Sequence, residues 1–310
     1  MEILRGYLGK LAVCAVGVLL VVCSPPLAPE GQFPAQTVEK DVHEAQNDEG
    51  VQDSPSALPL VAEGTWLLWT EIATCVATMG VEVESLSESL ALVTLDDLGG
   101  GLVKHRLHNC LIRQTPVLGI VTEVPDAVAE SIPEREYFGI LGGYEAGSVY
   151  LTQESVETWG LRLEDPFHDQ MPSSADDPRV WDMDGDGKPG VTLPVGPGLC
   201  EVYVIQRGFS RWSGRVESPT RVAGGGSAWG EERVLGATSG FCLAQNEVRY
   251  MDDLHRFALV RVDGSNGSMN LDFDGDGRVT CDEVRAYGLE PFAPRKPDDT
   301  HCKMQELTPR

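Results

Sequence analysis

Acidic side chains recur at every second position from residue 272 to residue 276, and another closes the segment at residue 283. The candidate oxygen donors of this segment are Asp272, Asp274, Asp276, Arg278, Thr280 and Glu283. Carboxylates at this spacing can converge on one hard cation, and Gly277 permits the sharp turn that brings them together. Arg278 would offer its carbonyl, Thr280 would act directly or through a water, and Glu283 would bind in a bidentate manner. The spacing therefore predicts a calcium site.

This twelve-residue segment resembles the EF-hand calcium loop position by position, with the apolar Val279 at the eighth place. It departs from that family in its frame, because the glycine, serine and asparagine residues at 264–268 predict no entering helix. An unpaired loop with a short exit helix resembles the bacterial dockerin-like variants more than the paired helical sensors. Cys281 lies inside the loop, and a disulfide at that position favours a rigid site over a switch.

A second acidic segment runs from residue 182 to residue 193, and its candidate metal-binding residues are Asp182, Asp184, Asp186 and Lys188. It is incomplete, because Leu193 stands where the bidentate glutamate is expected. It resembles the aspartate-rich repeats of thrombospondin type 3, which implies that carboxylates from elsewhere, here Asp176 or Asp177, complete the shell. A metal-free acidic turn is the alternative. A dockerin places its two loops close together, so the separation of the two segments argues against a cellulosome dockerin.

The first residues predict export. Basic Arg5 and Lys10 precede an apolar run over 11–22 that is short for a membrane span but suits the core of a signal peptide. The run ends at Cys23 and resembles the lipobox of bacterial lipoproteins, which implies a lipid-anchored Cys23 in an envelope lipoprotein. Val22 departs from the small residue that lipoboxes carry before the cysteine, so ordinary cleavage and secretion, or a retained signal, stay open. Residues 24–59, rich in Pro, Gln, Glu and Asp, predict a disordered acidic tether.

The cysteines agree with an oxidising compartment. Apart from Cys14 and Cys23, an even number remains, which suits disulfides outside the cytoplasm. We expect sequential pairing, Cys75 with Cys110, Cys200 with Cys242, and Cys281 with Cys302. Zinc is the alternative, and only Cys110 with His105 and His108 forms a suitable cluster.

Short apolar or alternating segments bounded by Gly, Pro, Asp or Ser predict a mainly β fold, a sandwich or a barrel. The expected strands are 66–69, 90–95, 102–112, 117–124, 202–206, 211–216, 233–235, 248–251 and 257–262, and the expected helices are 70–78, 153–159 and 282–287. Residues 60–170 and 171–265 form the two halves of the β domain, and the acidic loops are insertions on its rim. Residues 266–310 form the EF-hand-like C-terminal segment with a disulfide-tied tail.

Two glycine-rich segments predict turns. The triplet Gly99–Gly101 suits a tight hairpin, and residues 224–230 suit a hairpin connection between strands. In addition, Gly64, Thr65 and Trp66 resemble the GxW start of lipocalin-like barrels, which implies a barrel that carries an apolar ligand near Trp66.

The net charge of −24 and the pI near 4.5 argue against nucleic acid as a partner and favour cations or basic surfaces. No GxSxG, HExxH or P-loop motif is present. We therefore expect an exported protein with structural calcium, a binding or structural module whose partner is an extracytoplasmic protein or glycan and whose membrane attachment is the lipid anchor. The alternatives are a calcium-stabilised extracellular hydrolase of polysaccharide or protein, and the apolar-ligand carrier.

Overall fold

The computed structural model describes residues 59–78, 80–243 and 246–304. The predicted signal segment with Cys23 and the predicted tether, apart from Pro59, lie outside the described residues. Within them, no helix has the length and apolar character needed to cross a membrane.

The described chain is mainly β, as the sequence predicts. Its strands are β1 (Gly64–Thr78), β2 (Val81–Asp97), β3 (Leu102–Gln114), β4 (Arg135–Leu141), β5 (Val149–Thr152), β6 (Ser155–Trp159), β7 (Val191–Val195), β8 (Cys200–Ser218), β9 (Arg221–Ala237), β10 (Glu247–Tyr250) and β11 (Arg256–Arg261). Its α-helices are α1 (Asp126–Ser131), α2 (Cys281–Tyr287) and α3 (Thr300–Met304). Its 3-10 turns are η1 (Gly240–Leu243), η2 (Asp252–Leu254), η3 (Ser265–Gly267) and η4 (Glu290–Phe292).

The strands form one antiparallel sheet that closes on itself. The sheet runs in the order β1, β11, β9, β8, β5, β4, β3, β2, and β2 pairs with β1 again along the full length of β1. This ring of antiparallel pairs is a barrel, in which strands from both halves of the chain meet where β11 joins β1 to β9. The strands β6 and β7 extend the pairing of β8, and β10 pairs with β1 beyond the ring.

Alternation along the strands separates an interior from an exterior. In β1, Trp66 and Leu68 pack inside with Val93 of β2 and Phe257 of β11, so that one half of the barrel is filled by apolar side chains. In the same strand, Leu67 and Trp69 face outward.

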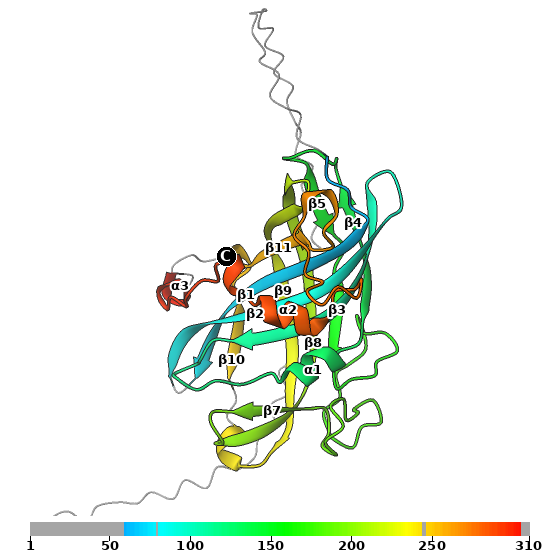
Figure 1. Ribbon diagram of the computed structural model, residues 1–310. Coiled ribbons are helices and arrows are strands. Elements are labelled where there is room, and N and C mark those ends of the chain that lie inside the picture. The colour runs from blue at the N-terminus through cyan, green and yellow to red at the C-terminus, as the bar shows by residue number, and fades with distance from the viewer. Residues whose placement is uncertain (1–58, 79, 244–245, 305–310) are drawn as a thin grey trace, which may run out of the picture. The chain divides into compact units, whose positions relative to one another are not determined.

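The outer face of β1, β2 and β3 is covered by the C-terminal segment. Val284 of α2 and Phe292 pack with Leu67, Trp69 and Leu111, and Phe292 stacks on Trp69 with ring centroids 5.4 Å apart. Figure 1 shows α2 lying over these strands. The strand β1 is therefore buried on both faces.

Two predicted helices are strands. Residues 70–78 belong to β1, where the β-branched residues Thr70, Ile72, Thr74, Val76 and Thr78 stand at every second position, a strand period. Burial on both faces hides the polar alternation that would have shown this strand in the sequence. Residues 153–159 mostly form β6, which pairs with β8. The helix predicted at 282–287 is confirmed as α2.

Some predicted strands and turns are also wrong. Residues 117–124 form isolated bridges, because Leu118 and Gly119 both adopt positive φ and turn the chain. The strands predicted at 202–206 and 211–216 are confirmed, although they are parts of the single strand β8. Residues 224–230 lie inside β9 rather than in a hairpin connection, whereas the hairpin at Gly99–Gly101 is confirmed, with positive φ at each glycine.

The disulfide pairing differs from the predicted one. Cys200 pairs with Cys242 as expected, but Cys75 pairs with Cys302 and Cys110 pairs with Cys281. The C-terminal segment folds back over β1 and β3, and this brings cysteines 227 and 171 residues apart into contact. The zinc alternative fails, because Cys110 is disulfide-bonded and His105 lies in the barrel interior against Tyr150. Three disulfides indicate an oxidising, extracytoplasmic environment.

Candidate calcium loops and the cavity of the barrel

The loop at 272–283 is folded around Asp272. The carboxylate of Asp272 accepts hydrogen bonds from the amides of Gly275, Asp276 and Gly277 at 2.8, 3.0 and 3.0 Å. The amide of Arg278 donates to Asp276 at 2.8 Å. These bonds fold the three aspartates inward, so that one carboxylate oxygen of each of Asp272, Asp274 and Asp276 lies within 4.8 Å of the others.

Glu283 ties the end of this loop to its beginning. Its Oε1 accepts from the amides of Phe273 and Asp274 at 2.6 and 3.3 Å, and its Oε2 accepts from the amide and hydroxyl of Thr280 at 2.8 and 3.0 Å. The amide of Thr280 is the main reason that the pKa of Glu283 lies below its usual value. Thr280 caps α2, and with Glu283 it forms a capping box. The three aspartates are thus brought together, while Glu283 lies alongside them, held by amides.

The loop at 182–193 has the same fold. The carboxylate of Asp182 accepts from the amides of Gly185, Asp186 and Gly187 at 2.7, 3.1 and 2.8 Å, and the amide of Lys188 donates to Asp186 at 2.7 Å. Oxygens of Asp182, Asp184 and Asp186 again lie within 4.8 Å of one another. Two segments far apart in sequence therefore build the same acidic turn.

The second loop ends differently. It leads into β7 rather than a helix, and Leu193 at the twelfth position is buried among apolar side chains. Thr192 binds the loop instead, because its amide donates to Asp184 at 2.8 Å and its hydroxyl donates to Asp186 at 2.6 Å. The sequence analysis did not identify Thr192 as a residue that binds the loop. Its polar side chain between the apolar Val191 and Leu193 follows the alternation of a strand, and this pattern would have indicated that Thr192 points away from the core. Asp177 does not complete the shell, since it forms a bidentate pair with Arg179.

Each acidic triad could hold a metal ion, and its dimensions are compatible with calcium. Calcium–oxygen distances of about 2.3–2.6 Å place two ligands on opposite sides of the ion up to about 5 Å apart, and both triads lie within 4.8 Å. In the second loop, one oxygen of Asp184 is buried without a hydrogen-bond partner among the described residues, and burial raises the pKa of Asp184. An orphaned carboxylate oxygen beside two further carboxylates suits a cation ligand.

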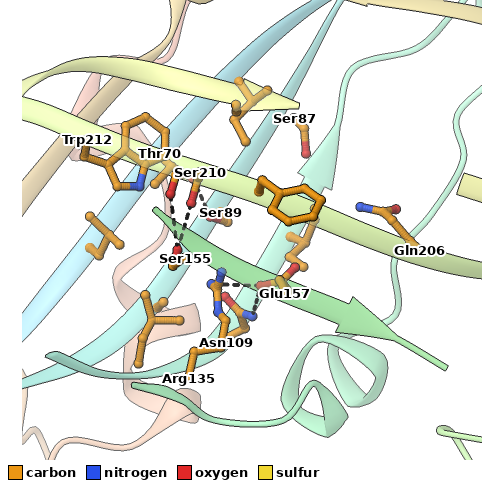
Figure 2. A pocket seen from close by; sticks show the side chains of 18 of the residues that line it. Thr70, Ser87, Ser89, Asn109, Arg135, Ser155, Glu157, Gln206, Ser210 and Trp212 are labelled. Carbon is orange, nitrogen blue, oxygen red and sulfur yellow. Dashed lines mark hydrogen bonds and ion pairs between the residues drawn. The ribbon is translucent and has the colours of Figure 1, made fainter. Parts of the chain in front are cut away.

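A cavity of about 130 Å³ lies inside the half of the barrel that the apolar core does not fill. Its lining comes from β1, β2, β3, β4, β6, β8, β9 and β10. Figure 2 shows its polar side chains: Thr70, Ser89, Ser155 and Ser210 gather on one side with Trp212 beside them, Asn109 and Arg135 point to Glu157, and Ser87 and Gln206 lie apart from these groups. The sequence analysis missed this site, because its residues are single polar positions dispersed over many strands.

Glu157 organises one wall of the cavity. Its Oε2 accepts from Asn109 Nδ2 and pairs with Arg135 Nη2, both at 2.8 Å, and its Oε1 accepts from Trp159 Nε1 at 2.7 Å. Opposite hydroxyls pair as well, Thr70 with Ser89 at 2.6 Å and Ser155 with Ser210 at 3.2 Å.

The chain matches no protein-family model, and no curated protein and no solved structure shows a significant similarity to it.

Proposed function

We propose that this is an exported calcium-binding protein in which calcium is structural and stabilises the loops of a barrel-shaped binding module. The observation that carries the proposal is the shared fold of the two acidic loops. In each loop the first aspartate accepts three successive amides, and three carboxylates converge within 4.8 Å. Such convergence concentrates negative charge that a divalent cation would neutralise.

The place of the loops in the fold supports a structural role for calcium. The first loop lies between Leu271, which is buried in the outer core, and α2, whose Cys281 is bonded to β3. The second loop enters β7, which pairs with β8. Binding of an ion to the folded loops alone would stabilise the folded state by about 1.4 kcal/mol when calcium is tenfold above the dissociation constant. Extracellular modules bind calcium with constants of about 10⁻⁴–10⁻³ M, and sites of that affinity fill outside the cytoplasm.

We also propose that the protein is delivered through its N-terminal signal, either anchored by a lipid on Cys23 or secreted. The support is the apolar run before Cys23 together with the three disulfides. Labelling of cells with an alkyne fatty acid tests the anchor. A lipid-anchored wild type should take up the label and the Cys23→Ala variant should not, whereas a secreted wild type should remain unlabelled like the variant. Equal labelling of both proteins would contradict the anchor.

Calorimetric titration of calcium into chelator-treated, oxidised protein tests the metal sites. We expect two sites in the wild type. The Glu283→Gln variant should weaken calcium binding to the first loop at least about tenfold, because it loses a charged ligand. The Asp182→Asn variant should weaken binding to the second loop to the same degree, because it changes the carboxylate that accepts the amides of that loop. Glu290→Gln, the same type of change at an exposed residue beyond the loop, is the control and should keep both sites. Absence of binding at about 10 mM calcium, together with a melting temperature indifferent to chelator, would contradict the proposal.

A further inference from the structure

Five large apolar side chains lie together on the outer face of the barrel, on β3, β4 and β5. Ile140 of β4 is paired with Leu102 of β3 and with Leu151 of β5, and paired residues share one face of a sheet. Phe138 and Val149 stand two positions from Ile140 and Leu151, so they lie on the same face. All five are between 38% and 57% exposed, and together they form the outer apolar patch.

The outer apolar patch departs from the pattern of a solvated strand. An antiparallel strand with one face in water carries polar residues on that face. The strands β4 and β5 are apolar on both faces, because Tyr137, Leu141 and Tyr150 fill the interior behind the patch. On β1 the outward Leu67 and Trp69 are covered by the C-terminal segment, whereas the patch is open. Exposed apolar side chains that adjoin one another mark a surface that contacts a partner or a membrane.

Positive charge borders the patch. Arg215 of β8 stands directly opposite Val149 in the β5–β8 register, and Arg211 lies on the same face of β8, four positions away. Both arginines are exposed, and neither forms an ion pair with an acidic side chain among the described residues. Although the whole chain carries a net charge of −24, this face therefore suits anionic groups such as phosphates, which guanidinium groups bind through paired hydrogen bonds.

The patch offers side chains to its partner and no backbone edge. The strand β4 is bonded to β3 and β5, and β5 is bonded to β8, so the backbone groups of this face are used within the sheet. An extended peptide therefore cannot add to it as a further strand. A second copy of the chain would bring another net charge of −24 and two more arginines against the patch, which opposes self-association.

The described chain also enters the barrel beside the patch. The amide of Leu60 donates at 2.7 Å to the carbonyl of Tyr144, in the turn between β4 and β5, which are neighbours in the sheet (Figure 1). A chain attached to a membrane before this point is therefore joined to the barrel next to the strands that carry the patch.

From these observations we propose that the outer apolar patch binds the surface of a phospholipid bilayer. Its side chains enter the boundary between headgroups and acyl chains, and Arg211 and Arg215 bind the phosphate groups of neighbouring lipids. The inference goes beyond structural calcium and does not depend on it, because no residue of the patch belongs to either acidic loop. It does not depend on a lipid at Cys23 either, and the test omits that residue.

Flotation of the oxidised chain 24–310 with vesicles tests the proposal. This chain lacks the signal and Cys23 but contains every described residue. The vesicles consist of phosphatidylcholine with about a quarter of phosphatidylglycerol, in about 0.15 M salt, at which charges more than about 8 Å apart are largely screened. We expect half of the protein to float at about 1 mM lipid, an affinity about tenfold below that of a single myristoyl chain.

Matched variants locate the binding surface. Ile140→Asp places a charge in the patch, and Ile120→Asp is the same change at an exposed isoleucine outside it. Ile140→Asp should weaken vesicle binding at least about tenfold, because the charge opposes insertion, and Ile120→Asp should leave it unchanged. Arg215→Gln should weaken binding about fivefold, whereas Arg233→Gln, at an exposed position far along β9, should not. If Ile140→Asp does not fold, as judged by its melting curve, Leu151→Thr replaces it, with a loss of at least about fivefold.

Absence of flotation at about 10 mM lipid would overturn the proposal. Flotation that the patch variant does not reduce, or that Ile120→Asp reduces equally, would overturn it as well. Light scattering without vesicles tests the alternative occupant, a second copy of the chain. We expect a monomer, and a dimer that Ile140→Asp dissociates would assign the patch to self-association instead of to the bilayer.

Discussion

Single glycines decide how closely two strands of the barrel approach. A Cβ at Gly224 in β9 would lie 2.2 Å from the carbonyl oxygen of Ser213 in β8, and one at Gly214 would lie 2.3 Å from that of Ala223. Neither glycine adopts a positive φ, so the need for glycine comes from close approach and not from backbone conformation. Close approach of β8 and β9 therefore requires glycine at residues 214 and 224. The glycine-rich segment 224–230 lies within strand β9.

We predict that Gly224→Ala lowers the free energy of unfolding by about 1–3 kcal/mol, since the strands must move apart to admit the methyl group. Gly208→Ala in β8 is the matched control, because the nearest atom to its added Cβ is 3.8 Å away. The free energy of unfolding of Gly208→Ala should equal that of the wild type or exceed it by at most about 1 kcal/mol. Denaturant unfolding measures both. Equal stability of the two variants would refute the argument from close approach.

At the scale of elements, the C-terminal segment is held over β1 and β2 by buried carboxylates as well as by apolar contacts. Glu71 is fully buried and pairs with Arg256 at 2.6 Å and with Arg295 at 2.7 Å. Burial opposes ionisation of Glu71, but the two arginines outweigh it and lower its pKa. Glu88 stands directly opposite Glu71 in the β1–β2 register and is only 8% exposed. Burial, and then the charge of Glu71, raises the pKa of Glu88 to about 7.

Stability should consequently fall as the pH rises through the range from about 4.5 to 7. In that window the unfolded chain has already lost the Glu88 proton while the folded protein keeps it, so ionisation of Glu88 disfavours folding. The Glu88→Gln variant should be more stable than wild type at pH 8, by at most about 3 kcal/mol, and similar to it near pH 4.5. Glu63→Gln, at an exposed position, should show no such dependence. Unfolding curves at the two pH values check this, and an identical gain at both would contradict it.

At the scale of the whole molecule, the disulfides enclose most of the described chain. Cys75–Cys302 closes a loop of 227 residues, Cys110–Cys281 one of 171, and Cys200–Cys242 one of 42. The first two join the C-terminal segment to β1 and β3, so the segment carrying the first acidic loop is covalently fixed to the barrel. A site in that position is suited to rigid binding rather than to switching.

Loss of the Cys75–Cys302 disulfide and loss of the Cys200–Cys242 disulfide should cost about the same. With Cys110–Cys281 intact, Cys75–Cys302 closes a loop of only about 56 residues in the unfolded chain, so in the chain-entropy account the two bonds differ by only about 0.3 kcal/mol. We predict that the Cys75→Ser/Cys302→Ser and Cys200→Ser/Cys242→Ser variants each lose about 2–5 kcal/mol, with losses within about 1 kcal/mol of each other. Guanidinium unfolding under non-reducing conditions gives both values. Losses that differ by more than about 2 kcal/mol would contradict the prediction.

The sequence by itself determined the features that depend on neighbouring residues. The acidic loops were visible because their oxygens and glycines lie within twelve positions, and α2 was predicted as the short exit helix that follows the first loop. The mainly β class followed from local alternation in segments such as β3, and the export prediction rested on the N-terminal apolar run and the cysteine content.

Only the tertiary structure decided what depends on residues distant in the chain. The disulfide partners of Cys75 and Cys110 follow from the path of the C-terminal segment. Residues 66–69 of β1 were recognised as a strand, but residues 70–78 were not, because both faces of the strand are covered. The cavity joins Thr70, Asn109, Glu157 and Ser210, each an unremarkable polar residue in its own strand. They become one site because the sheet closes on itself. Closure depends on pairing between strands that are far apart in the sequence, and no local sequence pattern predicts such pairing.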